Sequence, residues 1–273
     1  MRFSAGEAAF EGFRVTRHHP WAVAVWSGVY VLTLLAMIVT VAPILAPAFD
    51  EFRAFMVSGA PPSLQLQMRM LQAIVVVGPL NLVSQAILLP AIYRAMTTEG
   101  GDRFGFVRLG RDELRALGVL GILLILVIGI GVIGAFLRDL VSMLGLSVIG
   151  GGVMVAAIGA ILYVSVRLVL LAPASFATGR IDLAASWRST HRLFWPLLGL
   201  AIMAGVMGIM VNLLLSIIAM PLSEAAGGFV GISPITVVAG LGLLVLNGAA
   251  MAMGITIVSA PFMAAYREMT RGV

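Results

Sequence analysis

The chain has 273 residues, of which 61% are hydrophobic and 11% are charged, and its mean hydropathy is +1.09. Soluble globular domains are about 45–50% apolar and about 25% charged, so this composition excludes a water-soluble fold. All 17 basic residues are arginine, and cysteine is absent, which excludes disulfides, thiolate metal sites and cysteine nucleophiles. The net charge of +5 would suggest a nucleic-acid partner in a soluble protein. Here the arginines lie between long apolar runs, so we expect anionic phospholipid as the partner and no nucleic acid.

Six apolar segments reach the length of about 20 residues that a helix needs to cross the hydrocarbon core. In chain order they cover residues 21–43, 70–93, 116–137, part of 139–173, 193–219 and 235–264. The fourth interval exceeds one span, so residues 140–150 are predicted to serve partly as a connecting loop. The sequence therefore predicts a single all-α integral membrane domain over residues 1–273, a bundle of six transmembrane helices with both termini on one side.

The first apolar segment also has features of a cleaved signal peptide, because Ala46-Pro47-Ala48 loosely resembles a cleavage site. Its apolar run exceeds the usual 7–15 residues, and Glu7 and Glu11 lie in the segment before it. An uncleaved first span is therefore the preferred interpretation.

The arginines are distributed very unevenly between the two sides of this topology. Segments on the side of the termini hold 14 of the 17, and only Arg53, Arg69 and Arg138 fall on the other side. Cytoplasmic loops accumulate Lys and Arg, so both termini are predicted to be cytoplasmic.

Two distant segments share the pattern Tyr-Arg-x-Met-Thr, at residues 93–97 and 266–270, each shortly after a proline. Arginine-bearing segments with apolar residues at helical spacing precede the first, third and fifth spans, and they predict three amphipathic interfacial helices. The sequence thus predicts a threefold repeat of surface helix and two-span hairpin over about 1–97, 98–178 and 179–273. Two interpretations stay open: a functional site on the pseudo-symmetry axis, or duplication of a stable hairpin.

Arg167 is the cationic residue placed deepest in a predicted span, some six residues before Pro173. A bare buried charge is costly, so this side chain should snorkel, pair with Asp182 or another carboxylate, or bind a lipid phosphate. Guanidinium groups bind phosphate in bidentate fashion, and further arginines lie nearby in sequence. The candidates for lipid or phosphate binding are Arg167, Arg180, Arg188, Arg192, Arg111 and Arg115.

A small set of amide side chains lies deep within the spans: Asn81, Gln85, Asn212 and Asn247. Asn81 and Gln85 share one helix face, just beyond the Gly78-Pro79 pair that should kink the second span. These amides serve either interhelical hydrogen bonds or a polar cavity inside the bundle. Clusters of glycine and alanine in spans three to six predict a compact bundle.

Motifs for enzymatic chemistry are missing: the sequence has no Walker A pattern, no Gly-x-Ser-x-Gly and no His-Glu-x-x-His. The three histidines, His18, His19 and His191, are expected to be interface residues, so no metal site, cofactor or catalytic residue is predicted.

The segment around the fifth span has a distinctive order of residues. Arg167 to Pro173 is followed by Gly179, Ala184-Ala185-Ser186-Trp187-Arg188, and then Phe194-Trp195-Pro196-Leu197-Leu198-Gly199. Over about 40 residues this resembles the membrane domain found with some bacterial glycerophosphodiester phosphodiesterases and its stand-alone YciC-like relatives. The family often has an acidic residue where Thr178 stands, and His191-Arg192 lacks the surroundings of the phosphodiesterase signature. The resemblance implies a membrane module of the bacterial inner membrane without hydrolase activity.

The leading hypothesis is a non-enzymatic membrane protein whose arginine-rich cytoplasmic face engages anionic lipid or a partner protein, which includes a second copy of itself. The alternative is a transporter or channel for a small solute or lipid, with the four amide residues along its path. An enzyme acting on lipid headgroups ranks third, because no acid–base pair or metal cluster can be assembled.

Overall fold

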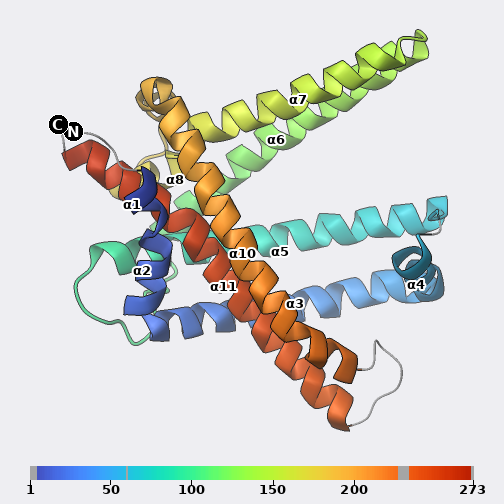
Figure 1. The fold of residues 1–273 in the computed structure, drawn as a ribbon, viewed down its shortest axis with the longest axis horizontal. Helices are drawn as coiled ribbons and strands as arrows, with labels where there is room; N and C mark the ends of the chain where they lie inside the picture. The colour runs from blue at the N-terminus through green and yellow to red at the C-terminus, as the bar shows by residue number, and fades with distance from the viewer. Residues whose placement is uncertain (1–4, 60, 227–233, 272–273) are drawn as a thin grey trace.

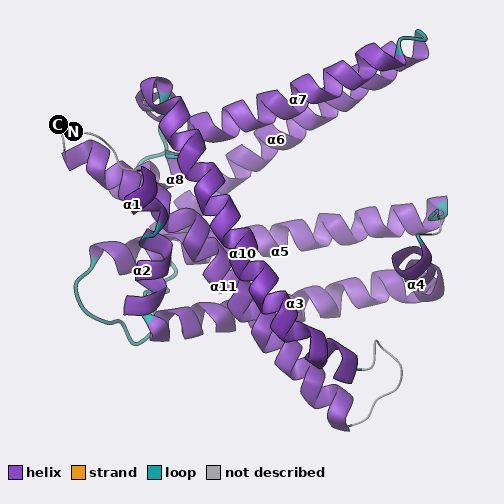
Figure 2. Cartoon of the chain, in the orientation of Figure 1, coloured by secondary structure: helices purple, strands orange, loops and turns teal. Residues whose placement is uncertain are grey.

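The computed structural model describes residues 5–59, 61–226 and 234–271, and the regular elements in those ranges are all helices (Figures 1 and 2). Six helical segments are long and apolar enough to cross a membrane, which confirms the prediction of six apolar spans. They are Pro20–Ser58, Leu64–Thr97, Arg111–Met143, Ser147–Thr178, Phe194–Ala225 and Ile235–Thr270.

The long helices form three antiparallel hairpins: α3 (Pro20–Leu45) with α5 (Leu64–Thr97), α6 (Arg111–Met143) with α7 (Ser147–Leu168), and α10 (Phe194–Ala225) with α11 (Pro234–Arg271). The hairpins converge at the end of the molecule that holds both termini and diverge toward their tips (Figure 1). At the convergent end α11 packs on α3 and α5, and α5 packs on α6. The predicted compact bundle is therefore limited to this end of the molecule.

Short helices complete both ends. At the convergent end α1 (Ala5–Ala9) and α2 (Glu11–His18) precede α3, while α8 (Leu171–Thr178), α9 (Leu183–Ser189) and the 3-10 turn η2 (His191–Leu193) link α7 to α10. At the opposite end η1 (Ala46–Ala48) and α4 (Phe49–Ser58) link α3 to α5.

The loop predicted within residues 140–150 is much shorter than expected. Helix α6 continues to Met143 and α7 begins at Ser147, and the turn between them uses Gly145 at φ 80°. This stretch has no proline and no charged residue to interrupt helical hydrogen bonding, so both helices extend through it. Glycine is the residue that adopts positive φ without strain, which places the turn.

Only two of the three predicted surface helices are separate elements: α1 with α2, and α9. The segment before the third span is instead the first turns of α6, which starts at Arg111. The Glu113 carboxylate accepts a hydrogen bond from the Gly110 N–H at 2.9 Å, so this capping contact starts the long helix directly after the loop. The three hairpins are present, but the surface helix is not repeated with the second.

Close helix crossings depend on a few glycines rather than on the whole set of small residues. A Cβ at Gly12 would lie 2.4 Å from Ile257 Cα, one at Gly134 2.5 Å from Ala157 Cβ, and one at Gly248 2.6 Å from Val31 Cγ2. These positions join α2 to α11, α6 to α7, and α11 to α3. Other glycines in the same clusters would meet nothing within 4 Å, among them Gly129, Gly131, Gly151, Gly152, Gly159 and Gly205. These glycines therefore do not mark close helix crossings.

Candidate anion site at Arg167

The fourth span breaks next to Arg167. Helix α7 ends at Leu168 and α8 begins at Leu171, because Pro173 has no N–H to continue the helical ladder. Arg167 is in the last turn of α7 and only 2% of its surface is exposed. The span thus continues past Arg167 toward Pro173, and the arginine is enclosed by protein instead of snorkelling into water.

The Arg167 guanidinium is stacked on aromatic rings. Its Cζ lies 4.5 Å from the centroid of the Trp187 ring and 5.9 Å from that of Tyr163, which are cation–π distances. Its Nε is buried without a hydrogen-bond partner, and no ion pair to it is found among the described residues. Asp182 accepts a hydrogen bond from the Ala185 N–H at 2.8 Å and caps α9, and no ion pair between it and Arg167 is found among the described residues.

The backbone of Arg167 is held by a buried hydroxyl. Thr190 is fully buried, and its Oγ1 donates to the Arg167 carbonyl at 2.8 Å, also lying 2.9 Å from the Ser186 carbonyl of its own helix. The break between α7 and α8 frees main-chain acceptors at this point, and Thr190 satisfies one of them. This contact fixes the position of α9 and η2 against the end of α7.

An open cavity of about 560 Å³ adjoins the guanidinium and is lined by Arg167, Trp187, Arg188, Ser189, His191 and Leu193. The Arg188 Nε donates to the Ala184 carbonyl at 3.3 Å, which leaves its two terminal nitrogens free to face a ligand. The lining includes two guanidinium groups, an imidazole and a hydroxyl, and no carboxylate. Such a set of donors binds oxyanions, with planar forks that match phosphate.

Trp187, which lines this cavity, belongs to a cluster of aromatic rings with residues of α7 and α10. Tyr163 packs edge-on against Trp187 at 5.8 Å between centroids and lies 5.4 Å from Phe194, which in turn contacts Trp195 at 5.5 Å. Tyrosine and tryptophan accumulate where a membrane protein passes from hydrocarbon to headgroups. An aromatic cluster of this kind beside Arg167 is typical of the membrane–water interface.

The six arginines predicted as lipid or phosphate ligands do not form one site. Arg167 and Arg188 share the cavity, whereas Arg115 pairs with Asp112 at 2.8 Å and Arg111 lines a separate apolar groove between α5 and α6. Arg180 is exposed in the link between α8 and α9. The side chain of Arg192 lies outside the described residues.

The four amide residues line two adjoining cavities of about 450 and 620 Å³. Asn81, Gln85 and Asn212 line the first, and Asn212 and Asn247 line the second. Gln85 Nε2 donates to Asn81 Oδ1 at 2.7 Å, and both Asn212 and Asn247 donate to carbonyls of their own helices. These hydrogen bonds each lie within one helix, and the amides line cavities, as the polar-cavity alternative from the sequence expects.

Arg94 and Arg267 are structural anchors that sequence reasoning did not single out. Arg94 Nη2 lies 2.7 Å from Glu113 and 3.0 Å from Asp112, which fastens the first hairpin to the second. Arg267 Nη1 donates to the Met96 carbonyl at 2.7 Å, which fastens the third hairpin to the first. The repeated Tyr-Arg-x-Met-Thr pattern was the available signal, since both arginines belong to it.

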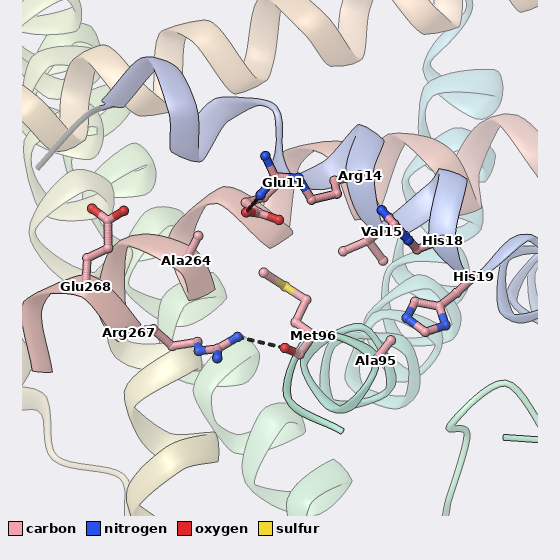
Figure 3. A pocket seen from close by; sticks show the side chains of 10 residues that line it. All are labelled: Glu11, Arg14, Val15, His18, His19, Ala95, Met96, Ala264, Arg267 and Glu268. Carbon is pink, nitrogen blue, oxygen red and sulfur yellow. Dashed lines mark hydrogen bonds and ion pairs between the residues drawn. The ribbon is translucent and has the colours of Figure 1, made fainter. Parts of the chain in front are cut away.

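Figure 3 shows the Arg267 contact within a charged pocket of about 280 Å³ between α2, α5 and α11. Glu11 pairs with Arg14 there at 2.6 Å, and His19 packs edge-on against Phe106 at 5.5 Å. The Glu11–Arg14 pair lies within α2, and the Arg267 contact joins α11 to α5.

The fold and the site together define a class: six candidate spans indicate a multi-pass helical membrane protein. No protein family, curated protein or solved structure matches this chain. The resemblance to the phosphodiesterase-associated membrane domain therefore stays a prediction.

Proposed function

We propose that this is a non-enzymatic protein of the bacterial inner membrane, with both termini cytoplasmic, that binds anionic phospholipid through the Arg167 cavity. The headgroup phosphate would take the place of the missing carboxylate partner between Arg167 and Arg188. The observation that carries the proposal is an arginine with 2% exposure, stacked on Trp187, and without an ion-pair partner among the described residues.

The energetics support a ligand at this position. Removing an unpaired ion from water costs several kcal/mol even after the protein relaxes, and stacking on one ring returns about 2 kcal/mol or less. A phosphate oxyanion in the cavity would supply the opposite charge and bidentate acceptors.

The location of the site supports a lipid as the source of the phosphate. The cavity lies beside the aromatic cluster, at the end of the molecule to which the sequence topology assigns 14 of the 17 arginines. Each basic residue near an anionic membrane surface contributes about 1 kcal/mol of attraction. The arginines outside the cavity would hold this end of the protein against the anionic leaflet.

Native mass spectrometry of the purified protein tests this proposal. After exchange into a neutral detergent with phosphatidylglycerol, we expect the wild-type protein to retain this lipid and Arg167→Leu to lose it about tenfold or more. Arg180→Leu is the matched control, because it removes an arginine of the same face that does not line the cavity, and it should retain the lipid. Equal retention by Arg167→Leu would contradict the proposal, and displacement by millimolar inorganic phosphate alone would identify a soluble anion as the ligand.

A transporter or channel is the second candidate function. It is favoured by one observation, the convergence of Asn81, Gln85, Asn212 and Asn247 on two adjoining cavities. The absence of charged residues from these two linings disfavours ions as the cargo.

A further inference from the structure

The cavity lined by Asn81, Gln85 and Asn212 lies where the first and third hairpins meet. Tyr30 of α3, Tyr93 of α5 and Ser259 of α11 also line it, so side chains from four long helices reach one space of about 450 Å³. Every polar group in this lining is uncharged. A ligand with a net charge would have no counter-ion here, so the cavity fits a neutral molecule that forms hydrogen bonds.

Several polar atoms in this cavity lack partners. Ser259 is 7% exposed and its Oγ is buried without a hydrogen bond. Tyr30 and Tyr93 are each 3% exposed, and their hydroxyls, which make no hydrogen bond within the described part of the chain, border the cavity instead of being sealed from it. A buried hydroxyl is normally satisfied, so Ser259 points to a hydrogen-bonding atom supplied by something else, and the two tyrosine hydroxyls are available to the same molecule.

The second cavity continues from the first along α10 and α11. The two share Asn212, Ala250, Gly254 and Val258, and the second is lined by residues of α10 and α11 alone. Because only two helices form its walls, its remaining side opens toward the hydrocarbon. It runs from Gly205 to Ala219, which at 1.5 Å per residue is about 21 Å, and its lining is largely apolar.

We propose that the two cavities together bind an uncharged glycerolipid of the diacylglycerol type. Its hydroxyl and ester carbonyls would meet the tyrosine, serine and amide groups, and one acyl chain would lie along the groove between α10 and α11. The polar cavity alone would suit a small polyol, but its continuity with a long apolar groove open to lipid favours a molecule with a chain. This inference concerns a site distinct from the Arg167 cavity and does not depend on it.

Filling the groove tests the proposal. Gly205 lines it, and a Cβ there would meet no atom within 4 Å, so Gly205→Leu adds a side chain at the groove wall at a position where its Cβ has open space. Gly199→Leu is the matched control, because Gly199 also lies in α10 with nothing within 4 Å but does not line the groove. The probe is palmitoyl-oleoyl-glycerol, and its retention on the full chain is measured by native mass spectrometry. Thermal unfolding of each variant verifies folding.

We expect the wild-type protein and Gly199→Leu to retain the probe equally. Gly205→Leu should retain at least about tenfold less probe, because the new side chain takes the place of several methylene groups of the acyl chain. Asn212→Leu should also weaken retention, since Asn212 lines both cavities. Equal retention by Gly205→Leu and the wild type would overturn the proposal. Displacement of the probe by glycerol alone would overturn the proposal in favour of a small polyol. If phosphatidylglycerol displaced the probe as well as unlabelled palmitoyl-oleoyl-glycerol does, the requirement for an uncharged headgroup would be overturned.

Discussion

Arg167 is a charged residue buried within a predicted membrane span, where an unpaired charge is energetically costly. Its carbon stem and guanidinium are buried at the end of α7, its ring partner is Trp187, and its carbonyl is held by Thr190. A salt bridge within the protein would offset this cost, yet Asp182 is engaged in capping α9. The arrangement is stable in a membrane if the opposite charge arrives with the lipid.

Thr190→Val should remove the hydrogen bond that holds the Arg167 backbone against α9. The substitution conserves shape but removes the hydroxyl that donates to the Arg167 carbonyl at 2.8 Å, leaving a buried acceptor unsatisfied. We expect the free energy of unfolding to fall by about 1–3 kcal/mol, measured by SDS-induced unfolding in mixed micelles, and phosphatidylglycerol retention to fall with it.

Thr178→Val is the control for this substitution. Thr178 is exposed and its hydroxyl donates to the Ala174 carbonyl of its own helix. Its removal should change the free energy of unfolding by no more than about 0.5 kcal/mol. A Thr190→Val protein as stable as Thr178→Val would show that the buried hydroxyl does not support the site.

Helix α2 packs closely on the third hairpin. It crosses α11 at Gly12, where a Cβ would lie 2.4 Å from Ile257 Cα and 3.0 Å from the Thr256 carbonyl oxygen. Backbone atoms do not yield as the end of a flexible side chain does, so a larger residue forces the two helices apart. The crossing thus holds the amphipathic amino-terminal segment on the third hairpin.

Gly12→Ala separates helix propensity from packing, because the two effects have opposite signs. Alanine favours an isolated helix by about 1 kcal/mol over glycine, but overpacking at this crossing should cost about 1–3 kcal/mol. We expect faster trypsin cleavage after Arg14 and Arg17 under native conditions. Gly6→Ala, which would meet nothing within 4 Å, should leave cleavage unchanged or slower. Slower cleavage of Gly12→Ala than of the wild type would contradict a close crossing of α2 and α11 at Gly12.

Hydropathy identified the spans, and it did so because a membrane requires long uninterrupted apolar helices. The predicted connection within residues 140–150 is confirmed in place but takes only residues 144–146, since apolar residues extend beyond the length that a bilayer needs and nothing in them stops a helix. The sequence pattern also predicted a separate surface helix near Arg111. In the structure the Glu113 capping contact starts α6 there instead. Amphipathic periodicity is the same for a surface helix and for the first turns of a span.

The candidate site was predictable in part. The position of Arg167 inside the end of a span was sufficient to single it out, and Arg188, which was grouped with it, lines the same cavity. The stacking on Trp187, the bond from Thr190 and the separation of Arg111 and Arg115 from the cavity depend on how α9 folds back on α7. Long-range contacts of this kind leave no periodic signal in a single sequence.

The whole molecule has one crowded end and three separated tips. Buried contacts, ion pairs between hairpins and the arginine-rich segments gather at the convergent end, while the diverging helices expose apolar side chains along most of their length (Figure 1). Lipid would fill the space between the tips, so the protein has more lipid contact than a closed bundle would have. Binding a specific anionic lipid at the crowded end would tie together the elements on which the hairpin arrangement depends.

Thermal unfolding of the full chain with and without phosphatidylglycerol tests the central claim most directly. Without anionic lipid, Arg167→Leu should unfold at a temperature no lower than the wild type, because it removes an unpaired buried charge. With lipid at about 100 times its dissociation constant, the wild type should gain about 2.7 kcal/mol and unfold at a higher temperature, while Arg167→Leu should not respond. An equal rise in unfolding temperature for both proteins would contradict an anionic-lipid site at Arg167.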